Sequence, residues 1–363
     1  MRDAKDRICC VIPSLASGGM ERVMATLVNG FVRMYGEEIH LILYGSEREV
    51  FYGVDPRVII HKPEFPFDNG HRKLSTIRTF FYLRKKIKRI RPSSVLSFGC
   101  FWNSFVLLAT FGLRIPVYVS DRSSPKKPYS RGQAALRRYL YPRAKGVIAQ
   151  TSIAKQICSM FYRNANTTVI GNPVNNLETS EVYEQDNIIV SVGRLIDTKN
   201  YDRLIKLFHE LDRPDWTLVI VGGDAQKQNR MQELKKQIES YGNPTNIVLV
   251  GTQKDVTSYL KRSKIFAFTS SSEGFPNVIG EAMSVGLPVV SYNCVAGPSD
   301  LVEDGKTGFL VETFDDDTFK KRLSELLDDE ELRMRMGKQA KQKIKEFSPD
   351  EIIRRFHEFI TNP

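Results

Sequence analysis

The feature of this sequence that most constrains its fold is a double series of short apolar runs separated by longer amphipathic stretches. The runs are rich in β-branched and aromatic residues and predict buried strands, whereas stretches such as Glu21–Tyr35 have the apolar spacing of helices. Strands that alternate with helices predict parallel sheets with right-handed crossovers, so we expect an α/β fold. The predicted strands of the first series are Ile8–Ile12, Ile39–Tyr44, Val95–Phe98, Val117–Ser120, Val147–Ala149 and Thr168–Ile170. Those of the second series are Ile188–Val192, Leu218–Val221, Ile247–Val250, Ile265–Phe268, Val289–Tyr292 and Phe309–Val311.

The two series predict two domains, because 363 residues exceed what one hydrophobic core usually holds. The segment Asn172–Asn176, and the polar, acidic stretch that follows it to Asp186, have the composition of a linker. We therefore place an N-terminal domain at residues 1–172 and a C-terminal domain at residues 173–347.

A separate helix is predicted at the end of the chain. Residues beyond about Asp317 have helical patterning, which is interrupted at Phe347–Asp350 before a last helix over Glu351–Ile360. A serine and an aspartate in the interruption can cap this helix, and the proline between them suits its first turn. We assign residues 348–363 to this helix.

The composition is that of a globular protein that does not cross a membrane. No segment reaches the roughly eighteen uninterrupted apolar residues that a spanning helix needs, and the start, Met1–Asp6, is not followed by a cleavable signal pattern. We therefore expect a cytoplasmic protein. The five cysteines are odd in number and mostly lie inside apolar runs, which favours buried free thiols over disulfides or a metal site. They are Cys9, Cys10, Cys100, Cys158 and Cys294.

Positive charge is concentrated in the first half of the chain. Residues 1–175 contain 28 Lys+Arg against 11 Asp+Glu, a balance of +17, whereas the remainder carries −6. A segment at 72–91 interleaves bases with apolar residues at helical spacing, which is typical either of a helix on an anionic membrane or beside a polyphosphate, or of a surface helix that buries its apolar face in its own domain. Both interpretations stay open here. The bases are Arg72, Lys73, Arg78, Arg84, Lys85, Lys86, Lys88, Arg89 and Arg91.

A candidate ligand site follows the predicted strand Ile265–Phe268. Two glutamates, Glu273 and Glu281, stand eight positions apart across a turn with the sequence GFPN, and a helix is predicted over Val278–Val285. Glu273 then lies in the loop at the carboxyl end of a strand, where α/β sheets bind ligands, and Glu281 lies about two turns into the helix. Carboxylates beside backbone N–H groups suit a ligand that combines vicinal hydroxyls with phosphates.

Two further loops carry residues that suit phosphates. Gly18 and Gly19 stand between a strand and a helix, where glycine lets the backbone approach a phosphate and the helix N-terminus attracts it. The alternative is a tight turn that needs positive φ. Arg194 and Lys199 follow the strand Ile188–Val192, and two cations there can clamp a diphosphate and neutralise its charge as it leaves. The alternative is a pair of solvated surface charges.

In these motifs the chain resembles the retaining glycosyltransferases of family 4, whose GT-B fold has two Rossmann-like domains with parallel sheets that face each other across a cleft. The run from Glu273 to Glu281 is similar to the E-x7-E signature of that family. Each motif alone is weak, but four in the right order at domain-scale separations are specific, and they cover nearly the whole chain. The matching segments are residues 18–22, 192–195 with 199–200, 273–281, and 296–300 with 304–309.

The resemblance implies a role for each candidate residue. Arg194 and Lys199 bind the diphosphate of a nucleotide-sugar donor. Glu273 contacts the donor sugar, with help from backbone groups of the turn after it, and Glu281 bonds the ribose hydroxyls. No Asp-x-Asp motif ends an apolar strand, so we expect a metal-independent enzyme and assign no metal site and no cofactor. The other residues assigned to substrate binding by these motifs are Gly18, Gly19, Gly251, Thr252, Phe275, Pro276, Asn277 and Val278.

One segment departs from the family pattern. Many relatives have a histidine after the fourth strand of the first domain, where this chain has the sequence SDRSSP at 120–125 and no histidine. We assign Asp121 or Arg122 to contact with the acceptor or the donor sugar, the alternative for Asp121 being a helix cap. This segment also resembles a subgroup that transfers sugars to lipid-linked or polysaccharide acceptors.

The resemblance implies a retaining hexosyltransferase that moves a sugar from a UDP-sugar to an acceptor hydroxyl. It also implies that the last helix, at residues 348–363, packs back on the N-terminal domain. The expected acceptor is a lipid-linked or cell-surface glycan, such as a polyprenyl-diphosphate-linked sugar, met at the inner face of the cell membrane by peripheral binding to anionic lipid. A nucleotide-sugar epimerase of the same architecture is the alternative. A basic nucleic-acid-binding protein is a further one, but the charge division and the lack of a recognised binding module argue against it, so we expect no nucleic-acid partner.

Overall fold

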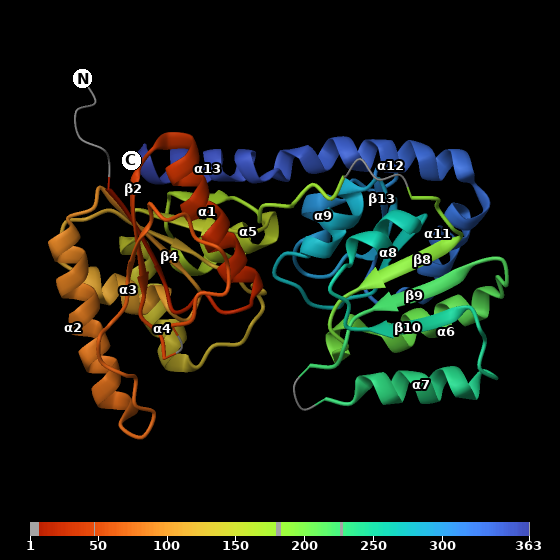
Figure 1. Ribbon diagram of the computed structural model, residues 1–363, viewed down its shortest axis with the longest axis horizontal. Coiled ribbons are helices and arrows are strands. Elements are labelled where there is room, and N and C mark those ends of the chain that lie inside the picture. The colour runs from red at the N-terminus through yellow and green to blue at the C-terminus, as the bar shows by residue number, and fades with distance from the viewer. Residues whose placement is uncertain (1–6, 47, 179–182, 226–227, 363) are drawn as a thin grey trace. The chain divides into compact units, whose positions relative to one another are not determined.

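The computed structural model describes residues 7–46, 48–178, 183–225 and 228–362 (Figure 1). It divides into two compact units, Met1–Pro173 with Pro349–Pro363 and Val174–Ser348, which we call unit 1 and unit 2. Within the described residues, unit 1 contains a parallel sheet of seven strands and unit 2 one of six. The predicted α/β class with two Rossmann-like sheets is therefore confirmed. Met1–Asp6 and residues 179–182 of the predicted linker lie outside the described part of the chain.

Unit 1 is built on a sheet with the strand order β3-β2-β1-β4-β5-β6-β7. The order reverses between β1 and β4, and ligands of such sheets bind at the carboxyl ends of the strands around this switch point. The strand β3 was not predicted, because it is short and its two isoleucines are exposed at the sheet edge instead of forming a buried apolar run. The strands are β1 (Arg7–Ile12), β2 (Glu38–Leu43), β3 (Ile59–His61), β4 (Ser94–Phe98), β5 (Val117–Ser120), β6 (Gly146–Ala149) and β7 (Thr167–Val169).

Four helices cover one face of this sheet. The connections from β3 to β7 cross the sheet in one direction, so the right-handed rule places their helices on the same face. Side chains from all four share one apolar core with strand residues such as Val95 and Val119. The connection from β1 to β2 runs the other way and carries α1 (Gly19–Tyr35). The four helices are α2 (Arg72–Ile90), α3 (Asn103–Thr110), α4 (Arg131–Leu140) and α5 (Ser152–Tyr162).

The last helix, α13 (Pro349–Thr361), belongs to unit 1 and packs beside α1 (Figure 1). It covers strands whose own helices all lie on the opposite face. The ring of Phe356 is 6.0 Å from that of Phe98 at the end of β4, and the ring of Phe359 is 5.4 Å from that of Tyr118 in β5. A Cβ atom at Gly146 of β6 would lie 2.6 Å from Phe359, so the absence of a side chain there admits the helix.

Unit 2 repeats the plan with the strand order β10-β9-β8-β11-β12-β13, which reverses between β8 and β11. Its strands are β8 (Ile188–Val192), β9 (Thr217–Val221), β10 (Ile247–Gly251), β11 (Ile265–Phe268), β12 (Val289–Tyr292) and β13 (Gly308–Val311). One face carries a core with α6 (Tyr201–Leu211), α7 (Arg230–Ser240) and α11 (Asp316–Asp328). The connections from β10 to β13 carry α8 (Thr257–Arg262), α9 (Asn277–Ser284) and α10 (Pro298–Leu301), and α12 (Glu330–Ile344) packs on α9.

The structure can be compared with two predictions drawn from composition, one on the state of the cysteines and one on membrane-spanning helices. All five cysteines are buried free thiols, as predicted, and burial raises the pKa of Cys10 and of Cys158 to about 12. None of the helices in the described residues has the length and apolar content needed to cross a bilayer.

Candidate functional site

The carboxyl ends of β8 and β11 carry a buried ion pair at the switch point of unit 2. The Nζ atom of Lys199 donates to Oε1 of Glu273 at 2.7 Å, and the two side chains are only 14% and 16% exposed. The same Nζ lies 4.9 Å from the centroid of the Phe268 ring at the end of β11. The structure thus brings together two residues for which the family resemblance implies separate roles. It places them where a sheet of this topology binds its ligand.

Hydrogen bonds between the two loops fix this pair. The Ser271 N–H donates to the Thr198 carbonyl at 2.8 Å, and the Thr269 hydroxyl donates to the Lys199 carbonyl at 2.9 Å. Asn200 has a φ of 51°, in the left-handed region that asparagine tolerates, and its amide donates to the Thr269 carbonyl at 2.8 Å. The position of Lys199 is therefore set by the backbone of both loops.

Arg194, the other predicted cation, is exposed and makes no hydrogen bond or ion pair with the residues that the structure describes. It follows Gly193, at a point on the carboxyl edge of the sheet where the backbones after β8 and β9 approach each other closely. A Cβ atom on Gly222, after β9, would lie 1.8 Å from the Gly193 carbonyl oxygen, so only glycine fits there. The Gly222 N–H in turn donates to the Gly251 carbonyl at 2.9 Å. Arg194 is thus free to meet a ligand at this edge.

Gly251 and Thr252, which the sequence motifs assign to substrate binding, lie on the same edge. Gly251 ends β10 with a φ of 71°, a backbone conformation that favours glycine. The hydroxyl of Thr252 packs over Gly223, where an added Cβ would lie 2.2 Å from it. Both residues are two strands further from the switch point than Arg194, since Arg194 follows β8 and the sheet order continues from β8 through β9 to β10.

The turn after Glu273 is held by apolar packing. The side chains of Phe275 and Pro276 are buried, and the Phe275 ring lies 5.8 Å from that of Phe347. A Cβ atom on Gly297, whose φ is 104°, would lie 2.1 Å from Pro276. The matching motif at 296–300 therefore supports the turn. These two buried residues can meet a ligand only through their backbone.

Glu281 lies closer to the start of its helix than predicted. The helix α9 begins at Asn277, so Glu281 is its fifth residue and stands little more than one turn in, and the expected two turns was wrong. Val278 stands in the first turn, where backbone N–H groups lack helical partners. Asn277, Val278 and Glu281 are all partly exposed.

In unit 1, Gly18 and Gly19 join β1 to α1 without positive φ, so the tight-turn interpretation was wrong. Gly18 is extended, with a φ of −175°, and is held by the hydroxyl of Tyr52. This hydroxyl accepts from the Gly18 N–H at 3.0 Å and donates to its carbonyl at 2.9 Å. A Cβ on Gly18 would lie 2.3 Å from the carboxylate of Glu21, whose pKa is raised by burial. Gly19 is exposed at the start of the helix.

Asp121 forms a second buried ion pair, at the end of β5. Its Oδ2 atom lies 2.5 Å from Nη2 of Arg137, and the two side chains are 12% and 3% exposed. Its Oδ1 atom accepts from the Tyr141 hydroxyl at 2.7 Å and from the Asn103 amide at 3.0 Å. The next helix, α4, is capped by Ser130, so Asp121 is not the helix cap that the sequence left open.

The guanidinium of Arg137 is enclosed by aromatic rings and hydrogen bonds. It also donates to the Tyr162 hydroxyl at 2.7 Å and to the Cys100 carbonyl at 2.5 Å. Burial and then the Asp121 charge raise the pKa of the Tyr141 hydroxyl, which keeps it a donor. The rings stacked on Arg137 within 4.9 Å are those of Tyr129, Tyr141 and Tyr162.

Arg122 lies between two phenylalanine rings of unit 1. Its guanidinium is 4.7 Å from the Phe98 ring and 5.0 Å from the Phe356 ring of α13, and one nitrogen donates to Oδ1 of Asn172 at 2.8 Å. Its Nε and Nη2 atoms are buried and have no partner among the described residues. Burial lowers the pKa of Arg122 to about 9, against the opposing charge of Asp121.

Sequence reasoning missed Arg137, Tyr52 and the pairing of Lys199 with Glu273. An arginine on an amphipathic helix is usually exposed, and nothing in the sequence separates Arg137 from its exposed neighbour Arg138. The pairing of Lys199 with Glu273 joins residues 74 positions apart, which only the sheet order brings together. No set of three or more His, Cys, Asp or Glu side chains in the described residues is arranged to hold a metal ion.

Comparisons with known proteins identify the family. The family model described as Glycosyltransferase Family 4 matches residues 17–176, and that described as Glycosyl transferases group 1 matches residues 175–343. The amylovoran biosynthesis glycosyltransferase AmsD of Erwinia amylovora is 26% identical over 95% of this chain and 96% of its own length. A Campylobacter jejuni α-1,4-N-acetyl-D-galactosaminyltransferase, named for an undecaprenol-diphosphate-linked glycan acceptor, is 27% identical over 94% of each chain.

Solved structures share the fold. A Rickettsia africae glycosyltransferase has a TM-score of 0.85 at 18% identity over 99% of this chain and 98% of its own. Anabaena HepE in complex with UDP has a TM-score of 0.82 at 18% identity over 98% of this chain and 100% of its own. The chain described above therefore belongs to the glycosyltransferase family that the two models describe, and it is a glycosyltransferase of the GT-B type.

Proposed function

We propose that this protein is a retaining glycosyltransferase that moves a hexose from a UDP-sugar to an acceptor hydroxyl. The observation that carries the proposal is the Lys199–Glu273 pair at the switch point of unit 2, with the exposed cation Arg194 in the loop that leads to it. Cations bind a diphosphate, and a carboxylate accepts hydrogen bonds from sugar hydroxyls. The carboxyl edge of the sheet in unit 2 offers both groups side by side. The UDP complex of HepE, a protein of the same fold, supports the choice of nucleotide.

In this proposal Lys199 and Arg194 bind the donor diphosphate and neutralise the charge that develops as it leaves. Lys199 then exchanges part of its contact with Glu273 for a phosphate oxygen, which frees the carboxylate to accept hydrogen bonds from the sugar hydroxyls. Glu281 bonds the ribose, while backbone groups of the turn at 275–278 and of Gly251 and Thr252 complete the donor site.

Retention is explained by attack of the acceptor on the face that the diphosphate leaves. The departing phosphate oxygen takes the proton of the acceptor hydroxyl, so no protein nucleophile is needed, and catalysis consists of positioning and charge stabilisation. Because the cations perform that stabilisation, we expect turnover to persist in EDTA.

Unit 1 is proposed to hold the acceptor. Gly19 at the start of α1 is exposed for such contact, whereas the Gly18 N–H is already bonded to Tyr52. Asp121 is proposed to act indirectly, by fixing the loop that carries Arg122, because its carboxylate is occupied by Arg137, Tyr141 and Asn103. The two unpartnered nitrogens of Arg122 are the groups of that loop that an anionic substrate can satisfy.

We propose that the acceptor is carried on a lipid diphosphate and that α2 binds the membrane. The apolar residues of α2 fall into a buried set and an exposed set. Ile87 and Ile90 are buried in unit 1. Leu74, Ile77 and Phe81 are exposed and lie along one stripe of the helix. Exposed bases of the same helix flank and continue the stripe, which is the pattern of a helix that lies on an anionic surface. They include Lys73, Arg78, Lys85, Lys88 and Arg89. The undecaprenol-linked acceptor of the Campylobacter relative supports this choice.

The experiment that tests the proposed activity is the release of UDP from UDP-sugars, with and without a short-chain polyprenyl-diphosphate-linked N-acetylglucosamine. Release that depends on the acceptor, with a product whose anomeric configuration by NMR equals that of the donor, is expected. An inverted product would contradict retention. Conversion of the donor sugar without an acceptor would indicate the epimerase alternative, and no release from any UDP- or GDP-sugar would contradict the proposal.

Membrane binding is tested separately by co-sedimentation with liposomes. The fraction bound should rise with anionic lipid and fall as salt is raised, since the attraction is screened. The double change Ile77→Ser with Phe81→Ser should reduce binding at every salt concentration, whereas Lys85→Gln with Lys88→Gln should reduce it mainly at low salt. A protein that stays in the supernatant with anionic liposomes at low salt would contradict this part of the proposal.

A further inference from the structure

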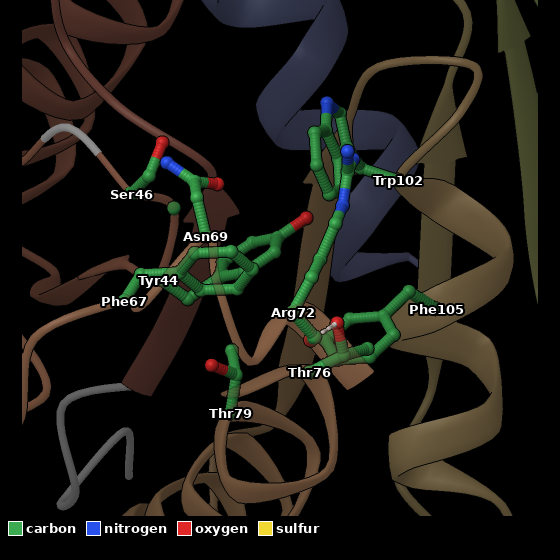
Figure 2. A pocket seen from close by; sticks show the side chains of 10 residues that line it. Tyr44, Ser46, Phe67, Asn69, Arg72, Thr76, Thr79, Trp102 and Phe105 are labelled. Carbon is green, nitrogen blue, oxygen red and sulfur yellow. Dashed lines mark hydrogen bonds between the residues drawn. The ribbon is translucent and has the colours of Figure 1, made fainter. Parts of the chain in front are cut away.

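Unit 1 contains a pocket of about 150 Å³ that is not part of the site described above (Figure 2). It lies at the carboxyl edge of the sheet, because Tyr44 follows β2 and Trp102 follows β4, the two strands that flank β1. We call it the β2/β4 pocket. The lining residues that matter below are Tyr44, Phe67, Asn69, Arg72, Trp102 and Phe105.

The walls of the β2/β4 pocket are mainly aromatic, and the hydroxyls of Thr76 and Thr79 at its lining already donate to backbone carbonyls of α2. The Tyr44 ring stacks on Phe105 with centroids 5.8 Å apart and meets the Trp102 ring edge-on at 6.0 Å. Phe67 adds a further ring. Such walls bind the apolar face or substituent of a ligand, while a few placed polar groups orient it.

One buried polar group in the pocket lacks a partner. Tyr44 is only 2% exposed, and its hydroxyl makes no hydrogen bond within the described part of the chain. Figure 2 shows this hydroxyl directed into the pocket, toward the side of Arg72 and Trp102. A buried hydroxyl without a partner costs about 1–3 kcal/mol, so a ligand atom that accepts its hydrogen bond removes a penalty already present in the fold. Burial also raises the pKa of Tyr44, which keeps the group a donor.

The rim is polar and movable. Arg72 is exposed at the first residue of α2, and Figure 2 shows its side chain extended past the pocket toward Trp102. It can turn aside without any change in the backbone, which gives a ligand access to Tyr44. Asn69 adds an amide to the same rim. The rim therefore offers hydrogen bonds to the part of a ligand that stays near solvent.

The size of the pocket limits what it takes. An apolar cavity of about 150 Å³ is known to hold a single benzene molecule, whereas a whole drug-sized ligand needs roughly 300–1,000 Å³. The β2/β4 pocket therefore accommodates one six-membered ring or one substituent of a larger molecule.

We propose that the β2/β4 pocket takes the acetamido substituent of a pyranose of the acceptor. The acetamido carbonyl oxygen accepts from the Tyr44 hydroxyl, and the acetamido methyl lies against the aromatic walls. The ring hydroxyls face the rim at Asn69 and Arg72. A sugar with hydroxyls alone would bring several polar groups against aromatic carbon without partners, which is unfavourable. This inference rests on the proposed glycosyl transfer and deepens it by naming a sugar unit of the acceptor.

The test is ligand-observed saturation-transfer NMR on the full-length protein, with methyl glycosides of N-acetylglucosamine and N-acetylgalactosamine and their counterparts without the acetamido group. Tyr44→Phe removes only the hydroxyl and should weaken binding about three- to tenfold, the range expected for one neutral hydrogen bond. Tyr118→Phe is the matched control, because Tyr118 is also buried with an unpartnered hydroxyl in unit 1 but does not line the pocket.

The expected result is strongest saturation at the acetamido methyl, weaker binding in Tyr44→Phe, and wild-type binding in Tyr118→Phe. Equal binding of sugars with and without the acetamido group, or wild-type affinity in Tyr44→Phe, would overturn the inference. Farnesyl phosphate is a competitor arm, and saturation of its chain protons that displaces the sugar would assign the pocket to a lipid chain instead. UDP affinity measured on the same samples distinguishes failure of the pocket assignment from failure of the proposed glycosyl transfer. If UDP binds and the sugars do not, only the pocket assignment is contradicted.

Discussion

The two units each place a buried ion pair after a strand at the carboxyl edge of the sheet, but they satisfy its charges differently. In unit 1, Asp121 and Arg137 have hydrogen bonds from Tyr141 and Asn103 and to Cys100 and Tyr162, and three rings stack on the guanidinium. In unit 2, the side chains of Lys199 and Glu273 have, among the described residues, only their mutual ion pair and the Phe268 ring as polar or ring contacts, and an exposed arginine stands in the adjoining loop.

This difference separates a structural charge from one available to a ligand. When both members of a buried ion pair already have their full set of hydrogen-bond partners, neither has a free group with which to bind a ligand. Removing one member then leaves the charge of the other buried without compensation. A pair with few partners can exchange one of them for a ligand group of the same charge. We therefore assign stability to Asp121–Arg137 and donor binding to Lys199–Glu273, and each prediction below tests one side of that division.

The largest expected effect is on the stability of unit 1. Arg137→Met leaves Asp121 buried without its cation and should lower the free energy of unfolding by about 3–5 kcal/mol, measured by urea denaturation. Arg138→Met is the control, because Arg138 is exposed on the same helix. Equal urea midpoints for the two variants would show that the pair in unit 1 is not the structural one.

The next effect is on catalysis by unit 2. Lys199→Met and Arg194→Met should each lower kcat by roughly 100- to 1,000-fold, the usual result of removing one group that stabilises developing charge. Lys206→Met, an exposed change on α6 with a side chain 58% exposed, should leave kcat unchanged. The unfolding free energy should fall less in Lys199→Met than in Arg137→Met. A Lys199→Met enzyme with normal turnover, or one that fails to fold, would reverse the assignment.

A smaller effect distinguishes the two glutamates within unit 2. Glu281→Gln should weaken binding of free UDP by about 1.5 kcal/mol, roughly tenfold, because the ribose contact exists without the sugar. Glu273→Gln should leave the affinity for UDP near the wild-type value and raise KM for the intact donor. Calorimetry with UDP and steady-state kinetics measure the two quantities. Loss of UDP affinity in both variants would show that the glutamates share one role.

A separate effect is the dependence of unit 1 stability on pH. His61, which is bonded to His40 at 2.9 Å, has its pKa lowered to about 4 by burial and by the charges of Lys86 and His40. The unfolded chain takes up this proton near its ordinary pKa of about 6.5, and the folded chain does not. The stabilisation is therefore present above pH 6.5 and is lost as the pH falls from 6.5 toward 4. His61→Gln should flatten this loss in urea titrations, and an unchanged slope would contradict it.

Sequence patterns predicted the strands well and the site only in part. Most of the residues assigned to substrate or catalysis stand in loops or helix starts that follow strands, and their placement followed from the strand runs themselves. Three features had no signal of this kind. The edge strand β3 is too exposed to form an apolar run, Arg137 has the same local pattern as exposed arginines, and the contact of Lys199 with Glu273 depends on strand order.

The measurement that most directly tests the division between the two pairs is a calorimetric titration of UDP into the wild type, Lys199→Met and Arg137→Lys. The arginine-to-lysine change keeps the charge beside Asp121, so the protein remains folded enough to titrate. We expect UDP to bind the wild type and Arg137→Lys with similar affinity and to bind Lys199→Met at least tenfold more weakly. Wild-type UDP affinity in Lys199→Met, or no binding of UDP or GDP to the wild type, would contradict the claim that the pair in unit 2 is the donor site.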